Sequence, residues 1–279
     1  MVLSGAMFSF DKLNRTVGSV DKVPWIAEIM PTKWSYEALM VYQFKDNKFQ
    51  KQFYEIKKTE SLADFKQVYL LPELQDRLGK VQEEVATSGS LTAHAEDLKL
   101  LVNEVNKERI LVPDIQFDEI EQIDLISPSP EELNQIEAYL NKLDDYYSIQ
   151  FYEANTKREN MILYFTKEKP GLYNQMKDMY HNESVEEHVR KVFEKNKMVE
   201  YRNELIQQID PVYKDPFPGS WLAFRSHFFA PRKYFLGRYH DTYWFNMSFI
   251  WFLTLLLYLT LYYDVLKKMM TWPGKFRIS

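Results

Sequence analysis

The run Thr242–Tyr263, TYWFNMSFIWFLTLLLYLTLYY, contains no charged residue. A helix rises about 1.5 Å per residue, so about 20 apolar residues are enough to cross the hydrocarbon core of a bilayer. Aromatic rings with a polar group, which prefer the membrane–water interface, flank the run: Tyr243, Trp244, Tyr262 and Tyr263. The alternative, a helix buried in a soluble core, rarely stays uncharged on every face. We therefore predict a transmembrane helix over 242–264.

Composition separates this run from the rest of the chain. The 279 residues carry a formal net charge of −5 and have a mean hydropathy of −0.43, so most of the chain is of a soluble, charged type. The length allows one sizeable domain beside the membrane segment. The mildly acidic balance argues against nucleic acid as a partner, because phosphate contacts need a basic face. Without cysteine, disulfides and thiolate metal sites are excluded.

The first ten residues, MVLSGAMFSF, lack the basic start of a signal peptide, and the apolar stretch is too short to span a bilayer. Taken as a complete protein, the chain would be tail-anchored with its bulk in the cytosol. An upstream part of a longer protein would change that topology.

The segment 1–45 contains short apolar stretches separated by turns. Val23–Met30 is apolar around Glu28, Pro31 breaks it, and Thr32 can cap the helix that follows. Two interpretations remain open. The stretches form a re-entrant or interfacial hairpin that surrounding protein shields, or they form an amphipathic hairpin in a soluble core.

The run LSGAMFSFDKLN…VPWIAEIMPTKWSYEALM resembles the segment after the fifth transmembrane helix of type-2 ABC exporters, especially the white/G subfamily. The residues that carry the resemblance are Ser4, Gly5, Phe8, Phe10, Asp11, Pro31, Trp34, Tyr36, Glu37 and Ala38. The resemblance implies re-entrant helices at the outer membrane face, an external loop, and a last transmembrane helix, for which 242–263 is in the right place. The long insertion between the two ends is similar to long bacterial variants of this group, such as those of Bacteroidetes.

The resemblance also implies partners. They are the lipid bilayer, the remaining transmembrane helices, a nucleotide-binding domain that holds ATP and Mg, and a second membrane domain in a dimer. It places the protein in a bacterial inner membrane, with the large domain periplasmic and the C-terminus cytoplasmic. The chain itself has no GxxxxGK[ST] loop, because its Gly274-Lys275 precedes Phe276. We therefore expect no cofactor and no ATPase activity in this chain.

The middle region, 46–210, has helical periodicity. Apolar stripes run through Ser61–Ala86, where Pro72 is expected to end or kink the helix. Ser129 and Glu132 form a capping box around Pro130. Further apolar stripes consist of Leu98, Leu101, Val105, Leu133, Ile136, Leu140 and Leu143. Ser184 and Glu187 form a second capping box. The pattern predicts an all-α domain whose last helix ends before Pro211.

The segment 211–241 begins with a proline-rich linker and continues with aromatic residues among Arg225, Arg232, Lys233 and Arg238. Such a mixture is typical of the lipid headgroup layer, although a surface helix has the same composition. After the apolar run, Lys267 and Lys268 begin a basic tail, 265–279. Basic residues there favour a cytoplasmic C-terminus.

The sequence contains no recognisable catalytic constellation. His181 and His188 lie near several acids, but HExxH is absent, and we predict no metal site and no catalytic residue. Glu37 is the one acid that we expect to be partly buried, either in a structural hydrogen bond or in a gating or substrate path.

Together these features predict an all-α protein. Its parts are a re-entrant segment (1–45), a helical extracytoplasmic domain (46–210), a linker and interfacial segment (211–241), a transmembrane helix (242–264) and a basic tail. The expected function is that of the C-terminal portion of the membrane subunit of an ABC-type exporter. The alternative is a tail-anchored adaptor whose helical domain binds proteins in the cytosol. A membrane-tethered hydrolase is less favoured, because no catalytic group is recognised.

Overall fold

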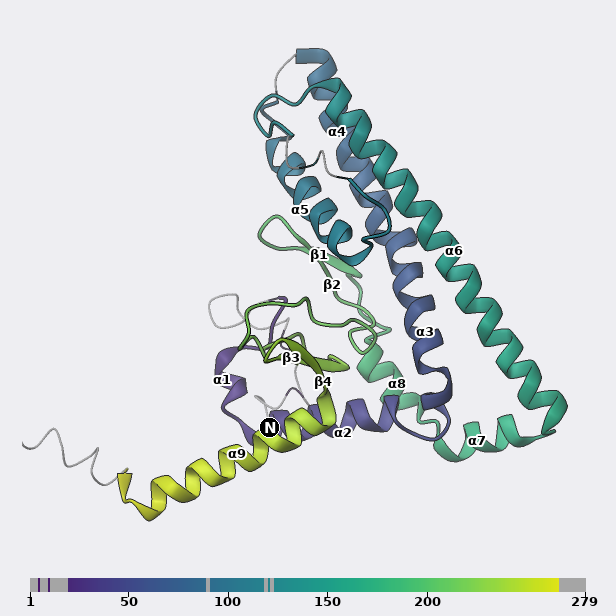
Figure 1. The fold of residues 1–279 in the computed structure, drawn as a ribbon, viewed down its shortest axis with the longest axis vertical. Helices are drawn as coiled ribbons and strands as arrows, with labels where there is room; N and C mark the ends of the chain where they lie inside the picture. Colours follow the sequence, from purple (N-terminus) through teal and green to yellow (C-terminus); the bar gives the residue numbers. More distant parts are fainter. Residues whose placement is uncertain are drawn as a thin grey trace, which may run out of the picture. The chain divides into compact units, whose positions relative to one another are not determined.

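The computed structural model describes residues 5, 10, 20–88, 91–117, 120 and 123–265. Helices dominate this part of the chain, and two short antiparallel sheets of two strands each accompany them (Figure 1). The chain divides into two compact units. Unit 1 combines Met1–Gln43 with Asp215–Ser279, and unit 2 is the continuous segment Phe44–Lys214.

Unit 2 begins with a long helical column. Helix α3 (Gln50–Phe65) continues through a π-helical turn (Lys66–Leu70) into α4 (Leu71–Ser88). The expectation that Pro72 ends the helix is therefore wrong. A proline has no N–H and its ring crowds the preceding turn, and the π turn directly upstream changes the hydrogen-bond register there. The column continues because this irregular turn accommodates the proline.

Two further helices complete the core of unit 2. Helix α5 (Ala95–Leu111) packs on α4, and α6 (Pro130–Glu168) lies along both α3 and α4 (Figure 1). The predicted apolar stripes face this core, where the buried members are Leu98, Leu101, Val105, Leu133, Ile136, Leu140 and Leu143. The helical periodicity of the sequence is confirmed here, because one apolar stripe per helix is what a layered helical core requires.

The start of α6 follows the predicted capping box. The Ser129 Oγ accepts a hydrogen bond from the Glu132 N–H at 3.3 Å, and the Glu132 carboxylate accepts from the Ser129 N–H at 2.6 Å. The second predicted box is wrong. After α7 (Leu172–Tyr180), helix α8 (Glu183–Arg190) is capped by Asn182, whose side chain accepts from the Val185 N–H at 3.1 Å. Ser184 lies inside α8.

The end of unit 2 departs from the all-α prediction. Strands β1 (Met198–Glu200) and β2 (Leu205–Gln207) pair antiparallel where a helix was expected to continue towards Pro211. Arg202 and Asn203 connect them, and both have positive φ angles, 55° and 57°. Two such residues form the turn whose twist matches a β-hairpin. Helix α8 has already ended at Arg190, where the next residue, Lys191, has a left-handed φ of 52°.

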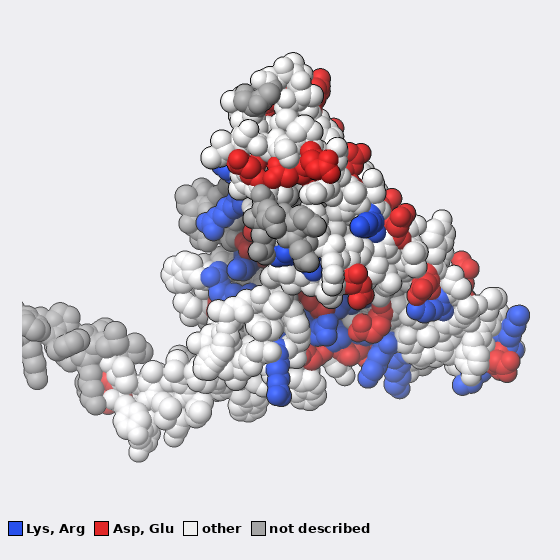
Figure 2. Space-filling model, turned by 45° about the horizontal axis from the view of Figure 1, so that its top comes forward, with Lys and Arg blue, Asp and Glu red and all other residues white. Residues whose placement is uncertain are grey.

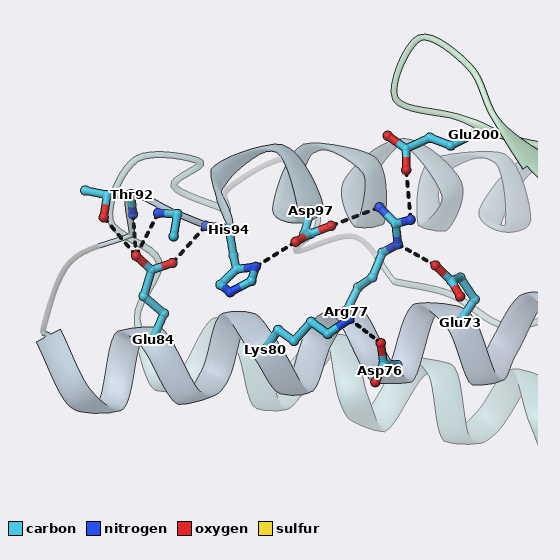
Figure 3. Close-up of polar contacts among 10 residues, drawn as sticks. Glu73, Asp76, Arg77, Lys80, Glu84, Thr92, His94, Asp97 and Glu200 are labelled. Atoms are coloured by element: carbon cyan, nitrogen blue, oxygen red, sulfur yellow. Dashed lines mark hydrogen bonds and ion pairs between the residues drawn. The ribbon is translucent and has the colours of Figure 1, made fainter.

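The surface of unit 2 carries its charged side chains in paired networks (Figure 3). The Glu84 carboxylate accepts from the backbone N–H groups of Thr92, Ala93 and His94 at 2.8–2.9 Å, just before α5 begins. Arg77 donates to Glu73, Asp97 and Glu200 at 2.8–2.9 Å and so links α4, α5 and β1. Both networks are formed at the rim of the apolar core.

Unit 1 consists of the short helix α1 (Trp25–Glu28), α2 (Pro31–Lys45), the hairpin β3 (Arg232–Phe235) and β4 (Arg238–Asp241), and α9 (Thr242–Tyr262). Leu236 and Gly237 form the hairpin turn with φ angles of 51° and 76°. The chain passes directly from β4 into α9, and Asp241 caps α9 by accepting from the Tyr243 N–H at 3.0 Å. The segment predicted as interfacial, with a surface helix as the alternative, therefore contains a β-hairpin.

Helix α9 differs from every other helix in the described part of the chain. It alone is long and apolar enough to cross a membrane. Only 6% of its apolar 18-residue stretch is buried within the protein. Its two buried residues, Thr242 and Asn246, lie in the first two turns. In Figure 2 the surface of α9 is white, whereas acidic and basic side chains are spread over unit 2. The described residues therefore include one helix that could span a membrane.

Candidate functional site

A cluster of charged and polar side chains is buried in unit 1, beside the first turns of α9. We call it the charge cluster. Its members come from α1, α2, the segment before β3, β3 itself and α9: Glu28, Lys33, Glu37, Ser226, Lys233 and Asn246. All six are buried, with exposed fractions of 0–8%. Buried lysines and glutamates are rare unless they are paired.

Local geometry explains why these side chains point inward. Lys33 and Glu37 are four residues apart on α2, so they lie on the same helix face. Alternation along β3 turns Lys233 into the protein, while its neighbours Arg232 and Tyr234 are only half-buried. Helix α2 and strand β3 therefore present their charges to each other.

The charged members form a continuous chain of contacts. The Lys33 Nζ lies 3.0 Å from Glu28 Oε2 and 3.2 Å from Glu37 Oε2. The Lys233 Nζ lies 2.6 Å from Glu37 Oε1 and donates to the Ser226 Oγ at 2.8 Å. Two ammonium groups thus face two carboxylates, and the cluster has no net charge when all four groups are ionised.

Asn246 joins this cluster to α9. Its amide nitrogen donates to Glu37 Oε2 at 3.0 Å and to the Trp34 carbonyl at 3.1 Å. The Trp34 indole in turn donates to the Glu28 carbonyl at 2.7 Å, and the Lys33 Nζ lies 3.7 Å from the Trp34 ring centroid. One amide in an otherwise apolar helix therefore fixes the position of α9 against α2.

The environment determines the ionisation of Glu37. Burial disfavours the charged form of this carboxyl, but the Lys33 and Lys233 ammonium groups and the hydrogen bond from the Asn246 amide favour it. The contacts therefore suit Glu37 as a carboxylate between its two lysine partners.

Two acceptors of the cluster have no hydrogen-bond partner among the described residues: Glu28 Oε1 and Asn246 Oδ1. An unmade hydrogen bond at a buried acceptor costs about 1–3 kcal/mol. A buried ion pair gives little net stabilisation over apolar packing, whereas removal of one partner is strongly destabilising. The cluster therefore contributes to the specificity of the fold more than to its stability. Its charges are paired only when α1, α2, β3 and α9 pack in this one arrangement.

Aromatic packing surrounds the charge cluster. The Trp34 ring lies 4.3 Å from that of Phe249 on α9, and both contact Phe224. A second aromatic group forms around Phe228. The Phe10 ring meets it edge-on at 4.9 Å, and a Cβ on Gly5 would lie 2.6 Å from its ring. Gly5 has a φ of 78°, so both its backbone and its packing favour glycine.

The structure thus brings together several residues of the exporter-like motif. Trp34, Glu37 and Ala38 are buried beside α9, Pro31 begins α2, and Tyr36 is half-buried with its ring 6.2 Å from that of Phe228. Ser4, Phe8 and Asp11 lie outside the described residues. Glu37 is buried, as expected, but the expectation that it is the one buried acid is wrong, because Glu28, Glu104, Glu108 and Asp210 are buried as well.

The predicted membrane-interface residues have different surroundings. Lys233 is 1% exposed and paired with Glu37, so its ammonium does not reach lipid headgroups, because strand alternation turns it inward. Arg232 forms an ion pair with Asp215. The Tyr243 ring lies 4.6 Å from that of Tyr42, and the remaining aromatic residues are exposed: Trp244, Tyr262 and Tyr263. Lys267 and Lys268 lie outside the described residues.

Sequence reasoning missed four members of the cluster. Glu28, Lys33, Ser226 and Asn246 were not identified as site residues, although all four are buried. A signal was present for Asn246, since it is the one amide in the apolar run. Lys33 and Glu37 are correctly spaced for a helix pair, but the same spacing is typical of exposed faces.

The histidines of unit 2 form hydrogen bonds rather than a metal cluster. The His181 ring contacts the Gln50 amide at 3.2 Å and lies 3.4 Å from the Glu186 carboxylate. No group of three or more potential ligands is found within the described ranges.

No family model, curated protein or solved structure matches this chain.

Proposed function

We propose that this chain is the C-terminal portion of the membrane subunit of an ATP-driven, ABC-type exporter. In this proposal α9 is the last transmembrane helix, α1 and α2 are the outer re-entrant helices, and unit 2 is an enlarged external domain. ATP and Mg are bound by a nucleotide-binding domain elsewhere in the polypeptide or complex. The remaining transmembrane helices and a second membrane domain complete the transporter.

The observation that carries the proposal is the reversed polarity of α1 and α2. Three of their four charged residues, Glu28, Lys33 and Glu37, are buried within unit 1, and the fourth, Lys45 at the end of α2, is half-buried. The exposed side chains are mainly apolar and include Trp25, Ile29, Met30, Leu39 and Tyr42. In water this arrangement is unfavourable, because apolar surface is exposed and charges are desolvated. In lipid it is favourable, so it supports re-entrant helices beside the start of α9.

The resemblance of the sequence supports the remaining assignments. In a bacterial inner membrane, unit 2 would lie on the periplasmic side, and the C-terminus would lie in the cytoplasm. Dimerisation of membrane domains and coupling to an ATPase rest on that resemblance.

A second candidate is a tail-anchored adaptor whose unit 2 faces the cytosol and binds proteins. Exposed apolar residues on the outer surface of α6 favour it: Ile149, Tyr152, Leu163 and Tyr164. Such side chains are suited to a protein partner.

Native mass separates the two candidates. An antibody raised against unit 2 would be used to determine the mass of the protein in its source cells. We expect a band several times larger than 33.5 kDa, because the ATPase and the earlier spans would be in the same polypeptide. A band at 33.5 kDa would favour the adaptor, or would require separately encoded transporter subunits.

Thiol labelling tests the sidedness of unit 2. These 279 residues contain no cysteine, so Lys157→Cys adds one thiol at an exposed position of α6, and the polypeptide without this substitution gives the background labelling. In spheroplasts of bacteria expressing the whole native polypeptide, the exporter topology predicts labelling by a membrane-impermeant maleimide. Labelling only after permeabilisation would support the adaptor. Lys80→Cys on α4 is a matched second site, and a cytosolic thiol protein is the control for intact membranes.

A further inference from the structure

The length of α9 limits where the bilayer surface can lie. Its 21 residues span about 31 Å, and the hydrocarbon core of a bilayer is about 30 Å thick. The helix is therefore just long enough to cross if its whole length, from Thr242 onward, lies in the membrane.

Other parts of unit 1 pack along one side of the first turns of α9. The Phe235 ring at the end of β3 lies 5.6 Å from that of Phe245. The Phe224 and Trp34 rings lie 5.7 Å and 4.3 Å from that of Phe249. We call these flanking elements, namely α1, α2, the segment 220–224 and the β3–β4 hairpin, the shoulder.

The shoulder extends a measurable distance along α9. Phe249 is seven residues after Thr242, which corresponds to about 10 Å of helix. Beyond Phe249 the helix offers about 20 Å to Tyr262, which is about 10 Å short of the hydrocarbon core. Mismatch costs a fraction of a kcal/mol per Å, so a deficit of about 10 Å would cost several kcal/mol if the shoulder stayed in water.

The outer surface of the shoulder has the composition of a surface in lipid. Its exposed large side chains include Trp25, Leu39 and Tyr42 from α1 and α2, and Trp221, Leu222 and Leu236 from the other elements. The last group is held together, because the Leu236 N–H donates to the Trp221 carbonyl at 2.8 Å. Glu28, Lys33, Glu37 and Lys233 are turned inward, Lys45 and Arg232 are half-buried, and Arg238 and His240 on the hairpin are exposed. Arg238, at the start of β4, has a side chain long enough for its guanidinium to extend towards lipid phosphates.

We infer that the shoulder is immersed in one leaflet of the bilayer, to a depth of about 10 Å along α9. Its partner is lipid. On one part of the shoulder, the outer faces of α1 and α2 contact the acyl chains and the membrane–water interface. On another part, Trp221, Leu222 and Leu236 make the same contacts. This inference rests on the membrane placement of α9 in the proposed function but not on transport.

Site-directed spin labelling of the full chain, reconstituted in phosphatidylcholine–phosphatidylglycerol vesicles, tests the inference. Single nitroxides at Leu39→Cys and Leu236→Cys report on two separate parts of the shoulder, and both residues are more than half exposed. Leu256→Cys on α9 is the lipid control, and Lys157→Cys on α6 is the water control. Collision with oxygen, which concentrates in lipid, is compared with collision with a water-soluble nickel chelate.

We expect the labels at 39 and 236 to favour oxygen, as the label at 256 does, while the label at 157 favours nickel. If the label at 256 collides mainly with oxygen but the labels at 39 and 236 collide mainly with nickel, the shoulder lies in water and the inference is overturned. The assignment of α9 as a transmembrane helix would remain. If 256 also favours nickel, α9 does not span, and both the inference and the proposed membrane placement fail. Because the two shoulder sites lie on different elements, each still reports if the other substitution disturbs folding.

Discussion

Unit 1 and unit 2 differ in the side chains that cover their outside. In unit 2 the large apolar side chains fill the core, where the buried Glu108 is paired with Lys66 and Tyr147. Charged networks such as those of Arg77 and Glu84 lie at the rim (Figure 3). In unit 1 two lysines and two glutamates are buried together, while apolar side chains cover the outside of α1, α2 and α9. The same chain therefore contains one unit built for water and one whose surface is suited to lipid.

The difference shows that the free energy of burying or exposing a side chain depends on whether the protein surface faces water or lipid. In water, apolar burial stabilises a fold by about 25 cal/mol per Å², and charges stay at the surface. In lipid, an apolar side chain on the protein surface carries no free-energy cost. A charged side chain there needs a partner within the protein. The charge cluster of unit 1 meets the second condition, and the core of unit 2 meets the first.

The strongest test of this contrast is Glu37→Ala. The substitution leaves the Lys33 and Lys233 ammonium groups buried with one carboxylate between them, and breaking a buried pair costs about 3–5 kcal/mol. We expect unit 1 to lose about that much stability in a denaturation titration of the full chain in detergent micelles. Glu153→Gln, at an exposed ion pair of α6, is the control and should change stability by less than about 1 kcal/mol. Equal effects of the two substitutions would contradict a structural role of the cluster.

A pair of lysine substitutions compares the two surfaces directly. Leu39 on α2 and Ile149 on α6 are similarly exposed, at 62% and 58%. If α2 faces lipid, Leu39→Lys should cost up to about 3 kcal/mol, whereas Ile149→Lys in water should stay within about 0.5 kcal/mol. The measurement is the fraction of chain that is correctly inserted and resistant to protease in vesicles. Indistinguishable variants would mean that both surfaces face the same solvent.

Asn246→Leu removes the polar contact between α9 and α2. Glu37 loses a donor, and a hydrogen bond to a charged group contributes about 1.5–3 kcal/mol. We expect a smaller loss than for Glu37→Ala, because both lysines keep their carboxylate partner. Thr254→Leu, on the exposed part of the same helix, is the matched control. Thermal unfolding in micelles measures both variants, and no difference between them would show that Asn246 does not anchor α9.

Ser129→Ala tests the capping box of α6 in unit 2. Loss of an N-cap hydroxyl typically costs about 1 kcal/mol, and here the hydroxyl accepts from the Glu132 N–H. Ser184→Ala should change stability less, because Asn182 and not Ser184 caps α8. Urea unfolding followed by circular dichroism measures the helices of unit 2. The opposite ranking of the two variants would restore the second predicted capping box.

The last expected effect is a pH dependence at Glu84. Hydrogen bonds from the Ala93 and Thr92 backbone lower the pKa of its carboxyl from 4.5 to about 2. A carboxylate with a lowered pKa stabilises the folded state above the unfolded pKa, and this contribution is lost as pH falls from 4.5 towards 2. Between pH 6 and pH 3 the urea midpoint of the wild type should therefore fall further than that of Glu84→Gln. Parallel curves would show that the contacts in Figure 3 do not favour the charged form.

Much of the fold is predictable because it depends on local pattern. The stripes of α5 and α6, the Ser129 cap and the apolar run of α9 are each recognised within one element. The two hairpins were not predicted. Arg202 and Leu236 adopt positive φ angles that their residue types do not favour, and Asn203, whose residue type tolerates such angles, is a weak signal by itself, so tertiary packing decides those turns. The continuation through Pro72 likewise depends on a π turn that the pattern does not encode.

The sequence by itself determined that the chain has helical stripes for a core and one apolar run long enough for a membrane, because both follow from residue spacing and length. It also indicated Glu37 as a buried acid among aromatic residues. Only the tertiary structure decided which groups neutralise that acid. Lys33 contacts it from α2 and Asn246 contacts it from α9. Lys233 contacts it from strand β3, at a separation of 196 residues along the chain. Partners so distant in sequence leave no periodic signal, since their contact exists only after the elements have packed.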